Sequence, residues 1–247
     1  MAAGAVVLGL LPTILALAGS STVELGLLFF RRPILAFLLG IGTPAIMPIR
    51  TFDYRDPAEI LHKRQDQVVE PKLSKTIAHN IIALQYILTL GALANIAHIT
   101  WQLSTMTVVS FAPATQFLPS IWVGLGIVIH LFGTAAVMLR AKLTLCDAAG
   151  AGKTAKQVFQ EELSLCARQP KARLTLRAET YKFILFSWVT SMLTIIHIIL
   201  GTLIFSSMLL VGGGDAVIVA GRLLVSTAVC RIILMFELSG MRKVIET

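Results

Sequence analysis

Charged residues are scarce in this sequence, and their scarcity argues against a water-soluble fold. Asp, Glu, Lys and Arg make up 14% of the chain and apolar residues 56%, whereas an ordinary soluble domain carries about 25% charged residues. The apolar residues lie in uninterrupted runs of roughly 18 or more, which are long enough to cross the hydrocarbon core of a bilayer. The composition therefore predicts a membrane protein.

Cysteine is also scarce. The three cysteines, Cys146, Cys166 and Cys230, are too few and too widely spaced for a disulfide framework. The first two fall in a basic loop that the charge pattern assigns to the cytoplasm. We therefore expect reduced thiols.

Acidic residues are outnumbered by basic ones, and the excess has a clear location. The chain holds 21 Lys and Arg against 13 Asp and Glu, and 19 of the 21 lie outside the four longest apolar runs. Residues 102–120 contain none. Loops rich in Lys and Arg stay on the cytoplasmic side of a membrane and attract anionic lipids. The net charge of +8 is therefore interpreted as topology, with the lipid bilayer and not nucleic acid as the expected partner.

The four longest apolar runs are expected to be transmembrane helices. They cover about residues 77–101, 118–139, 183–211 and 216–238. Residues 140–182, between the second and third run, hold nine Lys or Arg residues, so this loop and the C-terminus are placed in the cytoplasm. The sequence thus predicts an integral, multi-pass protein of the plasma membrane or an endomembrane.

Apolar residues within the cytoplasmic loop indicate a short amphipathic helix. Val158, Phe159, Leu163 and Cys166 recur at helical spacing. The pattern is compatible with a helix on the membrane surface and equally with an ordinary solvated loop helix.

Residues 1–49 form an N-terminal hydrophobic unit with two possible paths. Residues 1–19 are apolar enough to span and are expected to be retained, because no basic segment precedes them and Pro12 interrupts the run. Arg31-Arg32-Pro33 follows, and residues 33–47 are short for a span. The second segment is therefore expected to be re-entrant or interfacial, with a full hairpin as the alternative.

Residues 50–76 are expected to form a cytoplasmic polar helix and linker. Asp56-Pro57-Ala58-Glu59 has the pattern of a helix start, with a cap, then proline, then glutamate. This explains the acidic residues Asp53, Asp56 and Glu59 without a metal, although carboxylates also suit Mg²⁺; no metal site is assigned. The predicted fold class is an all-α integral membrane protein, with a bundle of four transmembrane helices in residues 77–247 plus the N-terminal spanning or re-entrant unit.

Two histidines fall near the middle of different predicted spans. His130 and His197 lie at similar depth, which is the arrangement that a bis-histidine haem needs. The alternative is that each imidazole is satisfied by a neighbouring hydroxyl or carbonyl group. We expect no cofactor, with haem b on His130 and His197 as the alternative.

The last apolar run contains two arginines, which are rare inside transmembrane helices. Arg222 and Arg231 lie several residues inside it, where a central charge costs about 2.5–3.5 kcal/mol on insertion scales. Nine residues at about 100° each place them on opposite helix faces, so different partners are expected. Asp215 lies one heptad before Arg222, while Glu24 or Glu237 suits Arg231.

These charges have two interpretations. In the first, they form internal ion pairs that fix the order of the helices. In the second, Arg222 or Arg231 binds an anionic substrate in a cavity, and Glu24 or Glu237 acts as the catalytic acid.

Two stretches resemble a set of small multi-pass membrane proteins of filamentous fungi. They are GSSTVELGLLFFRRPILAFLLGIGTPAIMPIRTFDYRDP and CRIILMFELSGMR. The resemblance implies no activity, but it implies one architecture in which the N-terminal segment packs against the last helix. Its residues are Glu24, Arg31, Arg32, Pro33, Arg50, Tyr54, Arg231 and Glu237. In size and buried carboxylates the chain is also similar to fungal integral-membrane terpene cyclases, an analogy at the level of fold class.

Three functions stay open. The first is a non-enzymatic membrane subunit or scaffold, whose small residues Gly124, Gly126 and Gly133 pack against other helices and whose partners are other subunits or a second copy. The second is a membrane enzyme acting on an isoprenoid or lipid-like substrate. The third is a transporter or channel, which commonly shows inverted repeats that this sequence lacks.

Overall fold

Four long helices form the framework of the molecule. The computed structural model describes residues 2–47, 57, 74–146 and 155–246, which are mostly helical. The helices that are long and apolar enough to cross a membrane are α5 (Lys75–Met106), α6 (Leu118–Arg140), α8 (Tyr181–Ser206) and α9 (Gly213–Val244). The shortest has 23 residues, about 35 Å at 1.5 Å per residue, which exceeds a hydrocarbon core of about 30 Å. The prediction of four such helices is confirmed.

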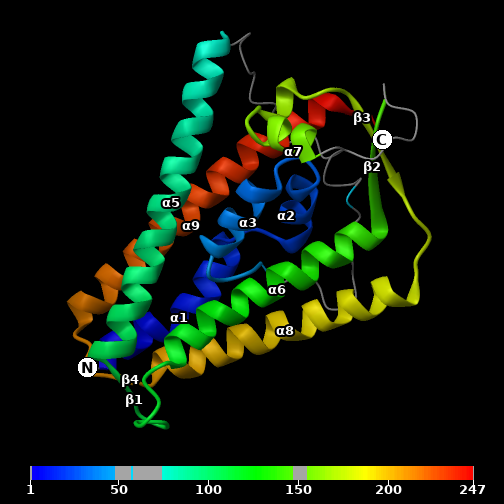
Figure 1. The fold of residues 1–247 in the computed structure, drawn as a ribbon. Helices are drawn as coiled ribbons and strands as arrows, with labels where there is room; N and C mark the ends of the chain where they lie inside the picture. The colour runs from blue at the N-terminus through cyan, green and yellow to red at the C-terminus, as the bar shows by residue number, and fades with distance from the viewer. Residues whose placement is uncertain (1, 48–56, 58–73, 147–154, 247) are drawn as a thin grey trace.

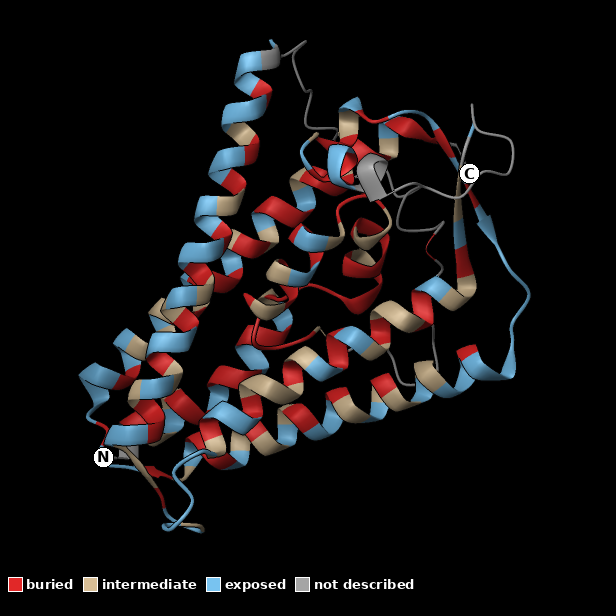
Figure 2. Ribbon diagram, viewed as in Figure 1, coloured by how far each residue is buried: buried red, intermediate tan, exposed pale blue. Residues whose placement is uncertain are grey.

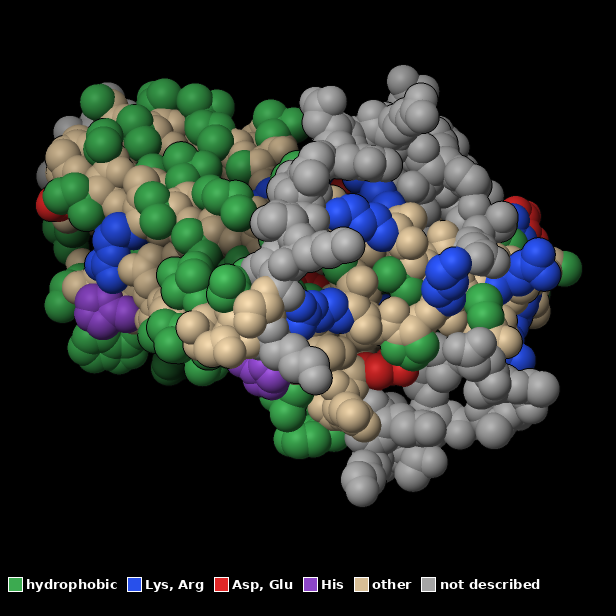
Figure 3. All heavy atoms as spheres, turned by 90° about the horizontal axis from the view of Figure 1, so that it is seen from above, with side chains coloured by type: hydrophobic (Ala, Val, Ile, Leu, Met, Phe, Trp, Pro, Cys, Tyr) green, Lys and Arg blue, Asp and Glu red, His purple; other side chains and the backbone are tan. Residues whose placement is uncertain are grey.

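The outward faces of these helices are apolar. Figure 2 shows exposed residues along α5 and α8, and Leu84, Ile87, Ile196 and Ile199 are each more than half exposed. In Figure 3, hydrophobic side chains cover one half of the visible face, whereas most Lys and Arg lie over the other half. This distribution suits helices surrounded by lipid chains, with the basic groups gathered at one end.

The N-terminal unit consists of three shorter helices. They are α1 (Ala2–Ala18), α2 (Thr22–Phe29) and α3 (Pro33–Ile41). A 47° bend separates α1 from α2. At the bend Ser21 Oγ accepts from Glu24 N at 3.2 Å, and the Glu24 carboxylate accepts from Ser21 N at 2.9 Å. This capping box begins a new helix, so the apolar run breaks there.

Helix α3 is too short to cross a bilayer. Its nine residues span about 13 Å, less than half of a hydrocarbon core. The helix begins at Pro33, a favoured first residue, and ends at Ile41. An added Cβ on Gly42, its C-cap residue, would lie 2.6 Å from Cys230 Sγ. Cys230 is in the middle of α9, so α3 ends partway along the bundle.

The N-terminal unit lies between two helix pairs (Figure 1). Helices α6 and α8 pack together on one side, and α5 and α9 pack together on the other. Helix α1 contacts α8 and α9, α2 contacts α6, and α3 contacts α5. The N-terminal segment therefore packs against the last helix, as expected from the sequence.

Two glycines on α6 allow close approach of the N-terminal unit. A Cβ on Gly133 would lie 2.3 Å from the Thr22 Cβ, and one on Gly126 would lie 2.8 Å from the Pro44 carbonyl oxygen. A Cβ on Gly124 would meet nothing within 4 Å. Of the three glycines predicted to pack against helices, Gly126 and Gly133 do so, whereas Gly124 faces open space.

The basic loop contains strands that the all-α prediction missed. Strand β2 (Ala141–Leu145) pairs antiparallel with β3 (Ala172–Leu176), and β5 (Ile245–Glu246) pairs parallel with β3. At the opposite end, β1 (Val108–Val109) pairs antiparallel with β4 (Met208–Leu209). The helical class holds, but β2, β3 and β5 join the loop to the C-terminus.

The helix predicted in this loop is shorter than expected. Helix α7 (Ala155–Glu162) ends before Leu163, and Cys166 begins a separate 3-10 turn, η1 (Cys166–Arg168). Phe159 is exposed, while Cys166 is buried, so these residues do not share one face. The predicted polar helix of residues 50–76 and its acidic cluster lie almost entirely outside the described residues.

Candidate functional site

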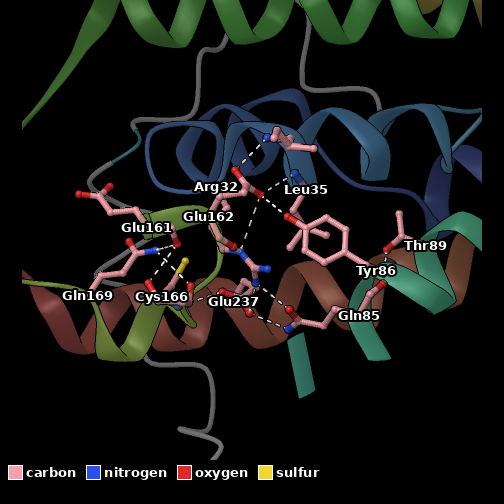
Figure 4. A network of polar contacts seen from close by, with 12 residues as sticks. Arg32, Leu35, Gln85, Tyr86, Thr89, Glu161, Glu162, Cys166, Gln169 and Glu237 are labelled. Carbon is pink, nitrogen blue, oxygen red and sulfur yellow. Dashed lines mark hydrogen bonds and ion pairs between the residues drawn. The ribbon is translucent and has the colours of Figure 1, made fainter. Parts of the chain in front are cut away.

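A buried network of polar side chains joins the N-terminal unit to later parts of the chain (Figure 4). At its centre, Arg32 Nη1 donates to Glu237 Oε1 at 2.9 Å and to Gln85 Oε1 at 2.6 Å. Arg32 Nε donates to the backbone carbonyl oxygen of Glu162 at 3.1 Å. The side chains of Arg32 and Glu237 are 0% and 1% exposed, so this ion pair is removed from solvent.

The Glu237 carboxylate is held by donors from three elements. Besides Arg32, Gln85 Nε2 on α5 donates to Oε1 at 2.6 Å, and the Cys166 backbone N–H of η1 donates to Oε2 at 3.0 Å. Glu237 itself lies on α9. A buried carboxylate is stable only when such partners replace its water, so this arrangement fixes the positions of α5, α9 and η1.

Glu162 caps α3 from the basic loop. Its carboxylate accepts from Ile34 N at 3.0 Å, Leu35 N at 2.9 Å and the Tyr86 hydroxyl at 2.5 Å. The first backbone N–H groups of a helix have no intrahelical partner and carry partial positive charge. Arg32, at the N-cap position of α3, provides no side-chain cap. Glu162, which lies 128 residues after Ile34 in the sequence, provides it instead.

Arg31 and Cys166 lie beside this network and outside the four long helices. Arg31 Nη2 donates to the Pro170 carbonyl oxygen at 2.8 Å, and burial lowers the pKa of its guanidinium. Burial, followed by the nearby Glu237 carboxylate, raises the pKa of the Cys166 thiol. None of the three cysteines forms a disulfide in the structure, and burial holds Cys166 as a neutral thiol.

Glu24 and Arg231 form a second, separate ion pair. Arg231 Nη2 donates to Glu24 Oε1 at 3.0 Å, and Nη1 donates to Glu24 Oε2. This two-bond geometry is the strong form of an arginine–carboxylate pair. Glu24 also belongs to the capping box of Ser21, so its carboxylate fixes the bend between α1 and α2. Of the two partners expected for Arg231, the structure pairs it with Glu24, while Glu237 binds Arg32.

Arg222 has different partners from those expected. Its Nε donates to Asn95 Oδ1 at 2.9 Å, and its Nη2 lies 3.3 Å from His98 Nδ1. Asn95 Nδ2 in turn donates to Ser226 Oγ at 2.7 Å. Asp215, the predicted partner, lies beside Gly212 at the start of α9. The expectation of an Asp215 pair is therefore wrong, because in the described part of the chain the guanidinium contacts polar groups of α5 instead.

A groove between α5 and α9 lies next to Arg222. Its volume is about 690 Å³, and its lining is mostly apolar. Asn95, Arg222 and Ser226 are its polar lining residues, and Gly91 and Gly221 also line it. A Cβ on either glycine would meet nothing within 4 Å. Neither Glu24, Glu237 nor Arg231 lines this groove.

The two mid-span histidines both contact the end of the N-terminal unit. His197 Nε2 lies 3.0 Å from the Pro44 carbonyl oxygen, and its ring stacks on Trp122 with centroids 4.7 Å apart. His130 Nε2 lies 3.5 Å from Thr43 Oγ1. Haem ligation through Nε2 would require these contacts to break. The Nδ1 atoms of both rings are buried and have no hydrogen-bond partner among the described residues.

The structure thus sorts the predicted site residues into four places. Glu24 and Arg231 meet, Glu237 joins Arg32, Arg222 lines the groove, and His130 and His197 meet at the Thr43–Pro44 segment. Sequence reasoning missed the roles of Gln85, Tyr86 and Glu162. The sequence did contain a signal for Glu162. Arg31-Arg32 lies between two apolar helices, and buried arginines need acidic partners. Glu161-Glu162 is an acidic pair in the loop that could have been proposed for this role.

Comparison of the chain with models of protein families, with curated proteins and with solved structures found no match.

Proposed function

We propose that this chain is a non-enzymatic membrane subunit or scaffold. Its four long helices cross the membrane, α1 and α2 together form a broken fifth span, α3 is re-entrant, and the basic loop and the C-terminus lie in the cytoplasm. Its partners are other membrane subunits or a second copy of the chain, and the proposal assigns no cofactor.

One observation carries the proposal: both candidate acids, Glu24 and Glu237, are occupied by structural partners. Each accepts hydrogen bonds from an arginine and from one backbone N–H group. Acid catalysis on a lipophilic substrate needs a carboxyl group facing a cavity that holds the substrate. Neither carboxylate lines the α5–α9 groove, which favours the structural interpretation of these charges over the catalytic one.

The membrane-enzyme alternative and the scaffold proposal differ in the effect of exchanging the Glu24–Arg231 pair. The double variant Glu24→Arg, Arg231→Glu keeps an ion pair but removes the acid from its position. We expect each single change to lower the yield of folded protein, and the double variant to restore part of it, because the pair is then complete again.

Lipid extracts of cells that express the wild type and the double variant provide the functional measurement. Under our proposal, mass spectrometry finds the same isoprenoids and lipids in both extracts. A lipophilic product that accumulates with the wild type and disappears with a folded double variant would establish an enzyme instead.

A further inference from the structure

We infer that the groove between α5 and α9 binds one anionic phospholipid of the surrounding bilayer, with its phosphate on Arg222 and an acyl chain along the groove. This site goes beyond a scaffold role and does not depend on it. Three features support this site: the charge of Arg222, the direction of its side chain, and the open space beside Gly91 and Gly221.

The charge of Arg222 is not neutralised by an acidic side chain. Among the described residues, its partners are the uncharged amide of Asn95 and the imidazole of His98. These contacts use two of the five N–H groups of a guanidinium, which leaves three without a partner in the described part of the chain. A cation in an apolar groove recruits an anion, and arginine suits phosphate because its planar group donates two parallel hydrogen bonds.

The side chain of Arg222 runs toward the end of the bundle that carries β1 and β4. Its Nε contacts Asn95, whereas the terminal Nη2 reaches His98, which is three residues closer to the C-terminal end of α5. The helical Cα–Cβ direction favours the same course, because it tilts toward the N-terminus of α9. Arg222 therefore places its charge toward the membrane–water interface, where a phospholipid carries its phosphate.

The remainder of the groove suits an acyl chain. Its α9 side runs from Ile218 to Val229, about 16 Å along the axis at 1.5 Å per residue. Gly91 and Gly221 leave open space on the two facing helices. Ile87, Ile218 and Val225 are more than 60% exposed, so the groove opens sideways to lipid. The volume of about 690 Å³ lies within the usual range of ligand pockets, about 300–1,000 Å³.

A lipid chain fits this groove better than a third helix. Asn95 Nδ2 donates to the Arg222 carbonyl oxygen at 3.0 Å and to Ser226 Oγ at 2.7 Å. These bonds hold α5 and α9 in direct contact at the polar end of the groove. A helix with side chains is about 10–12 Å wide, so it cannot enter between them, whereas an extended chain can lie along the seam.

Native mass spectrometry of the detergent-solubilised full chain tests the inference. The protein is incubated with equal amounts of phosphatidylglycerol and phosphatidylcholine, and the bound lipid is identified. We expect one phosphatidylglycerol per chain to be retained preferentially. The Arg222→Gln variant keeps a side chain able to bond Asn95 but loses the charge, and we expect its preference to fall about tenfold. The matched control Arg140→Gln, outside the groove, keeps the wild-type preference.

A second pair of variants tests the position of the chain. Gly221→Leu fills the groove without changing charge, and Gly124→Leu places the same side chain in open space on α6. We expect Gly221→Leu to lose the retained lipid and Gly124→Leu to keep it. Equal retention by Arg222→Gln and the wild type, or by Gly221→Leu and Gly124→Leu, would overturn the inference.

A cysteine at the groove distinguishes lipid from a second copy of the chain. Val225→Cys is exposed to the bilayer in a lipid-filled groove, so we expect it to react with a lipid-soluble maleimide in membranes. Efficient disulfide formation between two copies through this position, on addition of the oxidant copper phenanthroline, would show that protein covers the groove and would overturn the inference. This result would leave the scaffold proposal intact, so the two proposals fail separately.

Discussion

Glu237 and Glu179 each pair with one arginine, but at very different depths. The Arg32–Glu237 pair is 2.9 Å long with both side chains buried, whereas the Arg140–Glu179 pair is 3.3 Å long with the glutamate 61% exposed. Exposed ion pairs contribute about 0–1 kcal/mol. Removal of one partner from a buried pair costs about 3–5 kcal/mol, because the other charge stays in a dry site.

The same substitution at both positions therefore gives different losses of stability. We expect Glu237→Gln to lower the free energy of unfolding in detergent by about 3 kcal/mol. The control Glu179→Gln lowers it by less than about 1 kcal/mol. Denaturant unfolding followed by circular dichroism measures both. Equal losses for the two variants would show that the network around Arg32 does not stabilise the fold.

At the scale of helices and strands, α2 and α6 lie in close contact. Gly133 faces Thr22, and an added Cβ there would lie 2.3 Å from it, whereas Gly124 on the same helix faces open space. Glycine is less favourable than alanine inside a helix by about 0.8–1.0 kcal/mol, so a helix keeps glycine where a side chain does not fit.

Alanine at these two glycines of α6 has opposite expected effects. Gly133→Ala forces α2 away from α6 and lowers stability by about 1–3 kcal/mol, the usual effect of overpacking. Gly124→Ala leaves stability unchanged or raises it by up to about 1 kcal/mol. Thermal unfolding of the two variants in one detergent measures the difference. A Gly133→Ala protein as stable as Gly124→Ala would contradict the packing of α2 on α6.

Hydropathy predicted the long helices because their signal is local. The same is true of the break at Arg31-Arg32, where charge interrupts an apolar run. The cap of α3 by Glu162 and the pairing of Ala172 with Ile245 join residues far apart in sequence, and no local pattern specifies them. Arg222 could be predicted in part. The sequence indicated that this arginine needs polar partners, but it did not identify Asn95. Which residue of α5 faces Arg222 depends on how α5 and α9 pack.

At the scale of the whole molecule, charge distribution sets the proposed orientation. The loop containing β2, β3 and α7 shares one end of the bundle with the C-terminus through the β3–β5 pairing, and residues 140–182 hold nine of the 21 Lys and Arg of the chain. The β1–β4 turn region lies at the other end (Figure 1). The positive-inside rule then places the β2–β3 end in the cytoplasm.

Cysteine labelling of intact cells tests this orientation. Cys146 is exposed at the β2–β3 end, and Pro113→Cys introduces a thiol at an exposed position near β1. We expect a membrane-impermeant maleimide to label Pro113→Cys in intact cells and Cys146 only after permeabilisation. Cys166, buried and neutral, serves as the internal negative control. If Cys146 of protein at the plasma membrane reacts before Pro113→Cys in intact cells, the orientation is reversed.

The network around Arg32 also constrains the order in which the protein can mature. Arg32 is synthesised early, but its partners Glu162 and Glu237 follow 130 and 205 residues later. At about 5–20 residues per second, the ribosome needs about 10–40 s to deliver Glu237 after Arg32. During that interval the N-terminal helices carry an arginine with no acidic partner from the last helix. The Arg32–Glu237 pair can therefore form only after the last helix has been synthesised, so the contacts that hold the N-terminal unit to α9 are completed last.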